Sequence, residues 1–163
     1  MGSRSKKINT ENFAYIAGFL DGDGSLMLQL KKRSDTKSGI RFMATICFYQ
    51  DTRHSDSLVW FRTILGVGYL SNRKDGMTEL RVNGFDSVQK ILTLLRPFIK
   101  FKSVQTDALL EACNILKNNK ISSLNKRKLK KLVDLMFVIK KENYASHGIL
   151  TKKDVLKRLG LTP

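Results

Sequence analysis

The chain has 163 residues, 42% of them hydrophobic, so it is long enough and apolar enough to fold as one domain around a hydrophobic core. Its 30 Lys and Arg residues against 14 Asp and Glu give a formal net charge of +16, which favours nucleic acid as partner over acidic lipid or no polyanion at all. No apolar stretch approaches the roughly 20 residues that span a bilayer and no signal-peptide pattern opens the chain, so we expect an intracellular, non-secreted protein.

The cysteines and histidines exclude several kinds of metal site. Cys47 and Cys113 are the only cysteines, and His54 and His147 are the only histidines. They are too few and too far apart for a zinc finger, a zinc hydrolase or a histidine-centred nuclease. Any catalytic metal is therefore expected to have oxygen ligands.

The first predicted helix covers residues 10–21 and combines a core-facing stripe with small residues. Its core-facing residues, at helical spacing, are Phe13, Ile16 and Leu20. Small residues four apart let two helices approach closely, so we expect this helix to contact another helix. The residues expected at that contact are Ala14, Ala17, Gly18 and Asp21. Gly22 and Gly24 are expected to end the helix, because glycine adopts backbone conformations that other residues resist.

Two hairpins are predicted from the alternation of apolar and polar residues. The first pairs strands 26–33 and 41–48, and the second pairs strands 67–73 and 77–82 across a turn at 74–76. Helices are predicted at 53–65, 86–95, 104–116 and 124–141, and a short last helix begins at Thr151, where Asp154 completes a capping box.

The order helix, strand, strand therefore occurs twice. It predicts an α+β domain with an αββαββα core over residues 9–102 and additional C-terminal helices over 103–163. The core is expected to contain one four-stranded antiparallel sheet with helices on one side.

The outward face of this predicted sheet is rich in groups that bind bases and phosphates. A twisted sheet can lie like a saddle along a DNA groove, where Arg and Lys suit guanine, Gln suits adenine and Glu accepts from cytosine. Half-exposed sheets always carry polar residues outside, but five basic residues against one acid favour a DNA surface. The residues expected on this surface are Gln29, Lys31, Arg33, Arg41, Thr45, Ser71, Arg73, Glu79 and Arg81.

The nine residues from Ile16 to Gly24 (IAGFLDGDG) resemble the LAGLIDADG signature of homing endonucleases and intron maturases. The positions that match it identically are Ala17, Gly18, Asp21, Asp23 and Gly24. The match lies on a predicted helix that leads into a hairpin suited to DNA, which makes it more specific than nine residues alone. The resemblance covers about residues 10–102.

The resemblance implies site-specific cleavage of both DNA strands by metal-dependent phosphodiester hydrolysis, with short 3′ overhangs and a role in intron or intein mobility. It implies that Asp23 binds Mg²⁺ with the carbonyl of Gly22 beside it, since this ion prefers oxygen ligands. Mn²⁺ or Ca²⁺ is expected to bind the same site. Without the resemblance, an Asp in this position could equally cap a turn.

Three more catalytic residues follow from the resemblance alone. Gln50 falls where family members place a polar residue that orders active-site water, and Lys102 falls where they place a lysine close to the scissile phosphate. His54 stands where similar members have arginine, so it either organises water or is a solvated residue at a helix start, with Arg53 as an alternative basic group. The residues expected to be structural or incidental are Trp60, Cys113 and His147.

The motif occurs once, as in the members that work as two identical subunits packed through their motif helices. The resemblance therefore implies a homodimer with an isologous contact along this helix and a pseudo-palindromic double-stranded DNA target of roughly 20 bp. Asp21 is expected to stabilise the helix ends at this contact rather than bind metal. The lysine-rich C-terminal helices are expected to contact phosphates.

Three other functions remain open from the sequence. An RNA-binding intron maturase has the same motif helix but tolerates loss of the metal ligand, and a DNA-binding regulator has lost cleavage. A purely structural basic protein has no reason to carry the motif. The presence of Asp23, Gln50 and Lys102 together favours the nuclease, with neither a membrane nor a small-molecule substrate as partner.

Overall fold

The computed structural model describes residues 10–34, 39–143 and 150–162. His147 and residues 35–38, in the connection between the first two strands, lie outside these ranges. The elements in chain order are α1 (Thr10–Asp23), β1 (Gly24–Lys32), β2 (Ile40–Asp51), η1 (Thr52–His54), α2 (Asp56–Leu65), β3 (Tyr69–Asn72), β4 (Met77–Asn83), α3 (Phe85–Leu95), η2 (Arg96–Phe98), α4 (Ser103–Lys117), η3 (Ile121–Ser123), α5 (Lys126–Glu142) and α6 (Lys152–Arg158). The predicted repeat is confirmed: α1-β1-β2 is followed by α2-β3-β4.

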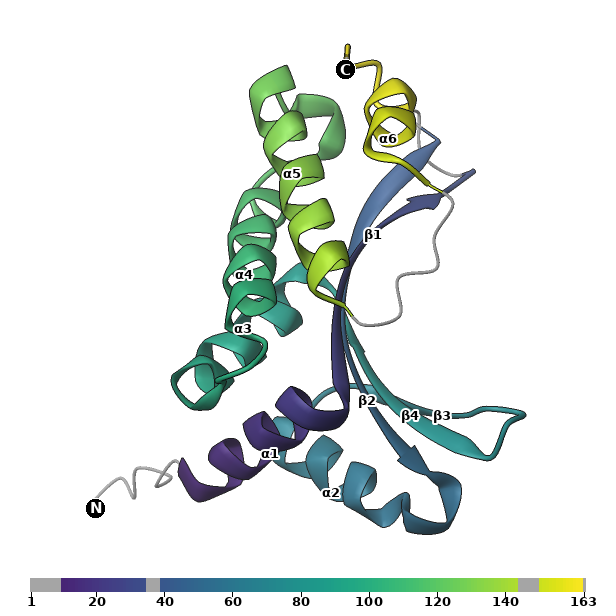
Figure 1. Cartoon of the computed structure of the whole chain (residues 1–163), viewed down its shortest axis with the longest axis vertical. Helices are drawn as coiled ribbons and strands as arrows, with labels where there is room; N and C mark the ends of the chain where they lie inside the picture. Colours follow the sequence, from purple (N-terminus) through teal and green to yellow (C-terminus); the bar gives the residue numbers. More distant parts are fainter. Residues whose placement is uncertain (1–9, 35–38, 144–149, 163) are drawn as a thin grey trace, which may run out of the picture.

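The strands form one antiparallel sheet in the order β1-β2-β4-β3. The register pairs Leu26 with Ile46 and Ile46 with Val82, so that these three side chains form a row across the sheet. All three are fully buried, because strand side chains alternate between faces and this face meets the helices. The sheet is strongly twisted and the long helices gather on one side of it (Figure 1).

The C-terminal helices complete the hydrophobic core. α4 packs between α3 and α5, and α5 also packs on β1, where the Asn143 side chain donates a hydrogen bond to the Leu26 carbonyl at 3.1 Å. One cluster of buried apolar residues continues from Ile16 in α1 to Leu156 in α6. α1 and α6 lie toward opposite ends of the longest axis of the molecule (Figure 1). None of the helices described is long and apolar enough to cross a membrane.

The end of α1 differs from the prediction. The helix continues to Asp23, and neither Gly22 nor Gly24 has a positive φ, so the expectation that they end the helix through unusual backbone conformations was wrong. Gly24 is required for packing: a Cβ there would lie 2.9 Å from both the Cα and the carbonyl oxygen of Leu20. A Cβ at Gly18 or Gly22 would meet no atom within 4 Å, because these glycines lie on the open side of the helix.

Other helix ends follow local rules. The segment predicted as one helix over 53–65 is divided into the 3-10 turn η1 and α2, and Gly66 ends α2 with a φ of 70°. The predicted capping box is confirmed, since the Thr151 hydroxyl accepts from the backbone N–H of Asp154 and the Asp154 carboxylate accepts from that of Thr151.

Candidate active site and sheet surface

Asp21 joins the end of α1 to the start of α4. Its carboxylate accepts three backbone N–H hydrogen bonds, from Lys100 at 2.6 Å, Phe101 at 3.2 Å and Lys102 at 3.0 Å. The side chain is 7% exposed. These contacts correct the expectation that Asp21 lies at a contact between subunits, because its bonding capacity is used inside its own chain. They confirm only that it stabilises a helix end.

Asp23, two residues later, takes no part in this arrangement. It is exposed, and within the described parts of the chain no hydrogen bond or ion pair engages its carboxylate. It lines an open pocket of about 450 Å³ between the end of α1 and the polar face of the sheet. The pocket residues are Asp23, Gly24, Ser25, Met27, Tyr49, Arg73, Met77 and Asn143. The two motif carboxylates therefore have different environments: that of Asp21 is buried and hydrogen-bonded within the protein, and that of Asp23 is exposed and accessible to a ligand.

Lys102 lies next to both carboxylates. It is 6% exposed, and its Nζ donates to the backbone carbonyl oxygen of Asp21 at 2.5 Å. Burial lowers the pKa of the Lys102 ammonium, and the negative charges of Asp21 and Asp23 partly oppose this shift. The structure thus brings Lys102 and the motif together, although about 80 residues separate them in sequence.

Gln50 and His54 lie at the end of β2 and in η1. The Gln50 side-chain oxygen accepts from the backbone N–H of Asp51 at 2.9 Å, and His54 is exposed. Arg53 donates to the Asp51 carboxylate through Nε at 3.0 Å and Nη2 at 2.8 Å, so this alternative basic group is tied to an acid. No hydrogen bond or ion pair joins Gln50 or His54 to Asp23 or Lys102 in the ranges that the structure covers.

The metal-binding capacity of one chain is small. In the described residues no three His, Cys, Asp or Glu side chains gather into a group that could hold a metal ion. Asp23 offers a single open carboxylate, with Gly22 beside it on the exposed side of α1. This donor chemistry fits a hard divalent cation, but further oxygen ligands have to come from outside the subunit.

The exposed side of α1 differs in part from the predicted helix contact. Gly18 is exposed and Ala14 half-buried, but Ala17 is fully buried, so it cannot touch a second chain. The apolar side chains that are exposed instead include Tyr15 (61%), Phe101 (81%) and Val104 (50%). Exposed apolar side chains near one element indicate an interaction surface, and Phe101 is the middle residue of the turn bound by Asp21. Sequence reasoning missed Phe101 because it lies in a connection without periodicity.

The aromatic residues beside α1 are held together by edge contacts. The rings of Tyr15 and Trp60 lie 5.7 Å apart at 77°, and Trp60 also packs on Phe61.

Both cysteines are buried, and burial raises the pKa of the Cys113 thiol to about 12 and that of the Cys47 thiol to about 11.

The outward face of the sheet holds most of the predicted residues. Lys31, Arg33, Arg41 and Arg73 are exposed, and Gln29, Ser71 and Arg81 are half-buried. Thr45 and Glu79 are buried, which the prediction of an accessible surface did not allow for. The Thr45 hydroxyl donates to Asn83 Oδ1 at 2.7 Å, and Asn83 in turn donates to the Tyr69 hydroxyl at 3.3 Å.

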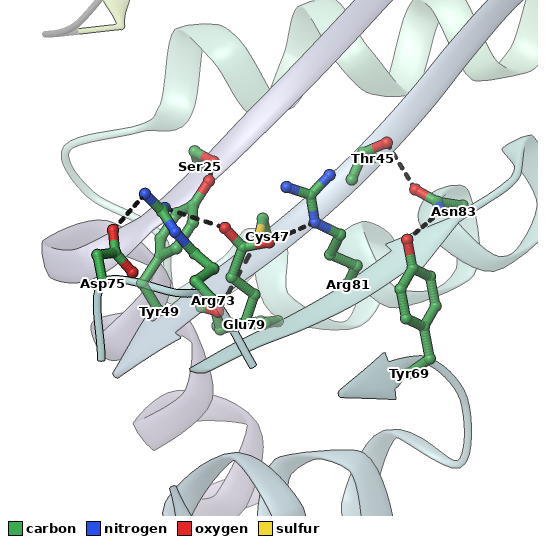
Figure 2. A network of polar contacts seen from close by, with 11 residues as sticks. Ser25, Thr45, Cys47, Tyr49, Tyr69, Arg73, Asp75, Glu79, Arg81 and Asn83 are labelled. Atoms are coloured by element: carbon green, nitrogen blue, oxygen red, sulfur yellow. Dashed lines mark hydrogen bonds and ion pairs between the residues drawn. The ribbon is translucent and has the colours of Figure 1, made fainter. Parts of the chain in front are cut away.

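Glu79 lies at the centre of this polar network (Figure 2). Its carboxylate accepts from Arg73 Nη1 at 3.1 Å and from Arg81 Nε at 2.6 Å. Burial opposes ionisation of Glu79, but the hydrogen bonds and charges of Arg81 and Arg73 outweigh it and lower the pKa of the carboxyl group. Burial and the two arginine contacts both disfavour the expected hydrogen bond from cytosine to Glu79, which stays a prediction. The alternation of side chains along β3 is enough to place Tyr69 on the outward face of the sheet. The hydrogen bonds among the polar residues of this face depend on how the strands pair, which the alternation does not give.

The fold and this site can be compared with known proteins. The family model described as LAGLIDADG endonuclease matches residues 16–106, which include the motif, the whole sheet and Lys102. The DNA endonuclease I-CvuI of Chlorella vulgaris is 31% identical over 150 residues, 91% of either chain. The DNA endonuclease I-CreI of Chlamydomonas reinhardtii is 31% identical over 116 residues, 71% of either chain.

A solved structure supports the same relationship. The crystal structure of the homing endonuclease I-CvuI in complex with its target, in the presence of Ca, has a TM-score of 0.82 and 28% identity, and the match covers 94% of this chain and 98% of that one. The agreement extends over the motif helix, the sheet and the C-terminal helices. The chain belongs to the LAGLIDADG endonuclease family.

Proposed function

We propose that the protein is a homodimeric, divalent-metal-dependent homing endonuclease that cuts both strands of a long pseudo-palindromic DNA target. The observation that carries this proposal is the contrast between the two motif carboxylates. Asp21 accepts three backbone N–H hydrogen bonds, whereas no group in the described residues binds the Asp23 carboxylate, which lines the pocket beside the polar face of the sheet and acts electrostatically on Lys102.

Each residue of the site supports one requirement of phosphodiester hydrolysis. Asp23 and the Gly22 carbonyl would hold a divalent cation, Mg²⁺ in particular, which supplies charge neutralisation and an activated water when it is bound. Lys102 is held by the Asp21 carbonyl and offers a fixed positive charge to the scissile phosphate. Gln50, at the end of β2, and His54, in the turn after it, would orient water.

A second copy of the chain would complete the site. One subunit provides a single open carboxylate, and two subunits packed through α1 would provide two near the two-fold axis. The open flank at Gly18 and Gly22 allows the two helices to approach, and the exposed rings of Tyr15 and Phe101 would be covered. The interface residues proposed here are therefore Ala14, Tyr15, Gly18, Gly22, Phe101 and Val104, without Ala17 and Asp21.

The polar face of the sheet would bind the DNA. It has no helix covering it in Figure 1, it carries the basic residues of both hairpins, and the chain has a formal net charge of +16. The related I-CvuI was solved with its target bound.

Cleavage of a randomised double-stranded DNA library tests this proposal. The protein is incubated with the library and Mg²⁺, and the cut ends are sequenced for wild type, Asp23→Asn and Asp86→Asn. Asp86 is an exposed carboxylate on α3, so Asp86→Asn is the matched control for loss of one surface charge.

Wild type and Asp86→Asn should cut both strands at one long, near-palindromic site, whereas Asp23→Asn should retain that DNA in a gel shift without cutting it. Light scattering should give twice 18.6 kDa. DNA that is bound but left uncut by wild type with both Mg²⁺ and Mn²⁺ would contradict the nuclease and favour the regulator, or the maturase if intron RNA binds instead.

A further inference from the structure

The two arginines around Glu79 differ in what remains free for a ligand (Figure 2). Arg73 donates from Nη1 to Glu79 at 3.1 Å and from Nη2 to Asp75 at 2.6 Å, so both of its terminal nitrogens already have a carboxylate partner. Arg81 donates only from Nε, to Glu79 at 2.6 Å. Within the part of the chain that the structure describes, no hydrogen bond or ion pair engages its Nη1 or Nη2.

This difference matters for reading a base. Arginine recognises guanine through two parallel hydrogen bonds to O6 and N7, which require two free N–H donors on one side of the guanidinium. Arg81 retains both Nη groups for such a pair while its Nε is fixed by Glu79. Arg73 already uses one N–H on each of its terminal nitrogens, so fewer of its donors remain for such a pair.

The position of Arg81 on the sheet suits this role. It lies on β4, one of the two inner strands, paired with Cys47 on β2 and with Tyr69 on β3. Cys47 is small and fully buried, so the longer Arg81 side chain extends over it on the outward face, where a third of its surface is exposed. The guanidinium is therefore accessible to a ligand on the outward face, and the contact with Glu79 restricts its orientation.

The neighbouring amide is less free. Asn83 would otherwise suit adenine, but its Oδ1 accepts from Thr45 and its Nδ2 donates to Tyr69. Each end of this amide already has one partner, so only one N–H and one oxygen lone pair remain for a base. Of the polar side chains in the network, Arg81 thus has the most complete set of free donors for a base edge.

We propose that Arg81 is a specificity-determining residue that reads one guanine in each half of the target, that Glu79 is its positioning residue, and that Arg73 braces the network without reading a base. This inference rests on the proposed function, because it requires DNA on the outward face of the sheet.

The test compares base preferences rather than activity. Wild type, Arg81→Met and Arg73→Met are each bound to a randomised double-stranded DNA library with Ca²⁺, and the retained sequences give the base frequencies at every position. Methionine keeps an unbranched stem of similar length but donates no hydrogen bond, and each variant removes one partner of Glu79, so the pair is matched.

Arg81→Met should lose a guanine preference of about tenfold to a hundredfold at one position of each half-site, with the other positions unchanged. Arg73→Met should weaken binding to all sequences to a similar degree and leave that guanine preference intact. Loss of a single-base preference in Arg73→Met, or an unchanged profile in Arg81→Met, would overturn the division of roles. A wild type that selects no sequence at all would instead overturn the proposed function together with this inference.

Glu79→Gln tests the positioning role with Arg81 still present. One amide oxygen can replace only one of the two carboxylate contacts, so the same guanine preference should weaken several-fold although the reading residue is intact. A purely structural role would lower the melting temperature without changing the base profile, and that result would contradict the assignment of Glu79.

Discussion

Asp21 and Asp23 lie two residues apart in one motif, and the structure predicts that the same substitution affects stability at one of them and cleavage at the other. Asp21→Asn should destabilise the fold, whereas Asp23→Asn should leave the stability nearly unchanged and abolish cleavage. The reason is the difference in partners: three backbone N–H groups bind the buried Asp21 carboxylate, and no described group binds that of Asp23.

The magnitude for Asp21→Asn follows from the hydrogen-bond inventory. Asparagine has one acceptor oxygen, so it can at best keep the bonds to Lys100 and Phe101, and its NH₂ group then faces the N–H of Lys102. Loss of one charge-assisted bond and an unsatisfied buried donor together cost about 2–4 kcal/mol. For a domain of this length each kcal/mol lowers the melting temperature by about 2–4 °C, which gives a decrease of roughly 4–16 °C. Asp23→Asn should stay within about 0.5 kcal/mol of wild type.

Thermal and urea unfolding followed by circular dichroism measure both variants. All samples need the same protein concentration, because a dimer has a concentration-dependent melting temperature. Cleavage alone does not separate the two residues, since displacement of Lys102 in Asp21→Asn also reduces it. An Asp21→Asn variant that melts within 1 °C of wild type, or an Asp23→Asn variant that is equally destabilised, would refute the reasoning.

Three further predictions concern other parts of the molecule. With pKa values near 11 and 12, Cys47 and Cys113 are about 0.1% and 0.01% thiolate at pH 8, so a thiol reagent should label neither until the protein unfolds, and rapid native labelling would contradict their burial. Since folding lowers the pKa of Glu79, the ionised carboxylate contributes fully to stability above the unfolded-state pKa near 4.5, and this contribution is lost as the pH falls through the lower folded-state pKa. The difference in unfolding free energy between wild type and Glu79→Gln should therefore shrink between pH 5 and pH 3 in urea titrations. A constant difference would argue against the arginine contacts. Phe101→Asp should leave subunit folding intact, because the ring is 81% exposed, but should weaken dimerisation by about 2 kcal/mol or more. If the variant sediments as a dimer at low micromolar concentration, Phe101 is excluded from the interface.

The local parts of the fold follow from the sequence, and the parts that depend on distant contacts do not. Alternation along the strands predicts the core rows such as Leu26 and Ile46, because a strand has a period of two whatever it packs against. The small-residue stripes of α1 are ambiguous in the same way: Ala17 and Gly18 look equivalent in sequence. Only packing inside the subunit leaves Gly18 open and covers Ala17.

The candidate site shows the same limit. The resemblance to the family points to Asp23 and Lys102, but the clamp between Asp21 and the turn before α4 joins residues about 80 positions apart, which no local pattern reveals. The burial of Glu79 was missed for a related reason. A charged residue on the outward face of a strand is expected to be accessible, but Glu79 is covered by Arg81 from its own strand and by Arg73 from the turn after β3.

The placement of α1 and α6 toward opposite ends of the longest axis has a consequence for protein engineering (Figure 1). If two subunits pair through α1, this first helix lies near the shared axis, whereas α6 lies toward the outer end of its own subunit. A single polypeptide made from two copies would therefore need a linker that returns along the length of the first copy before the second begins. A short turn would not reach, and a flexible linker would have to follow the helical side so that the sheet stays open to DNA. Linker length and route, rather than the joining of the two sequences as such, would decide whether such a fused version folds into the paired arrangement.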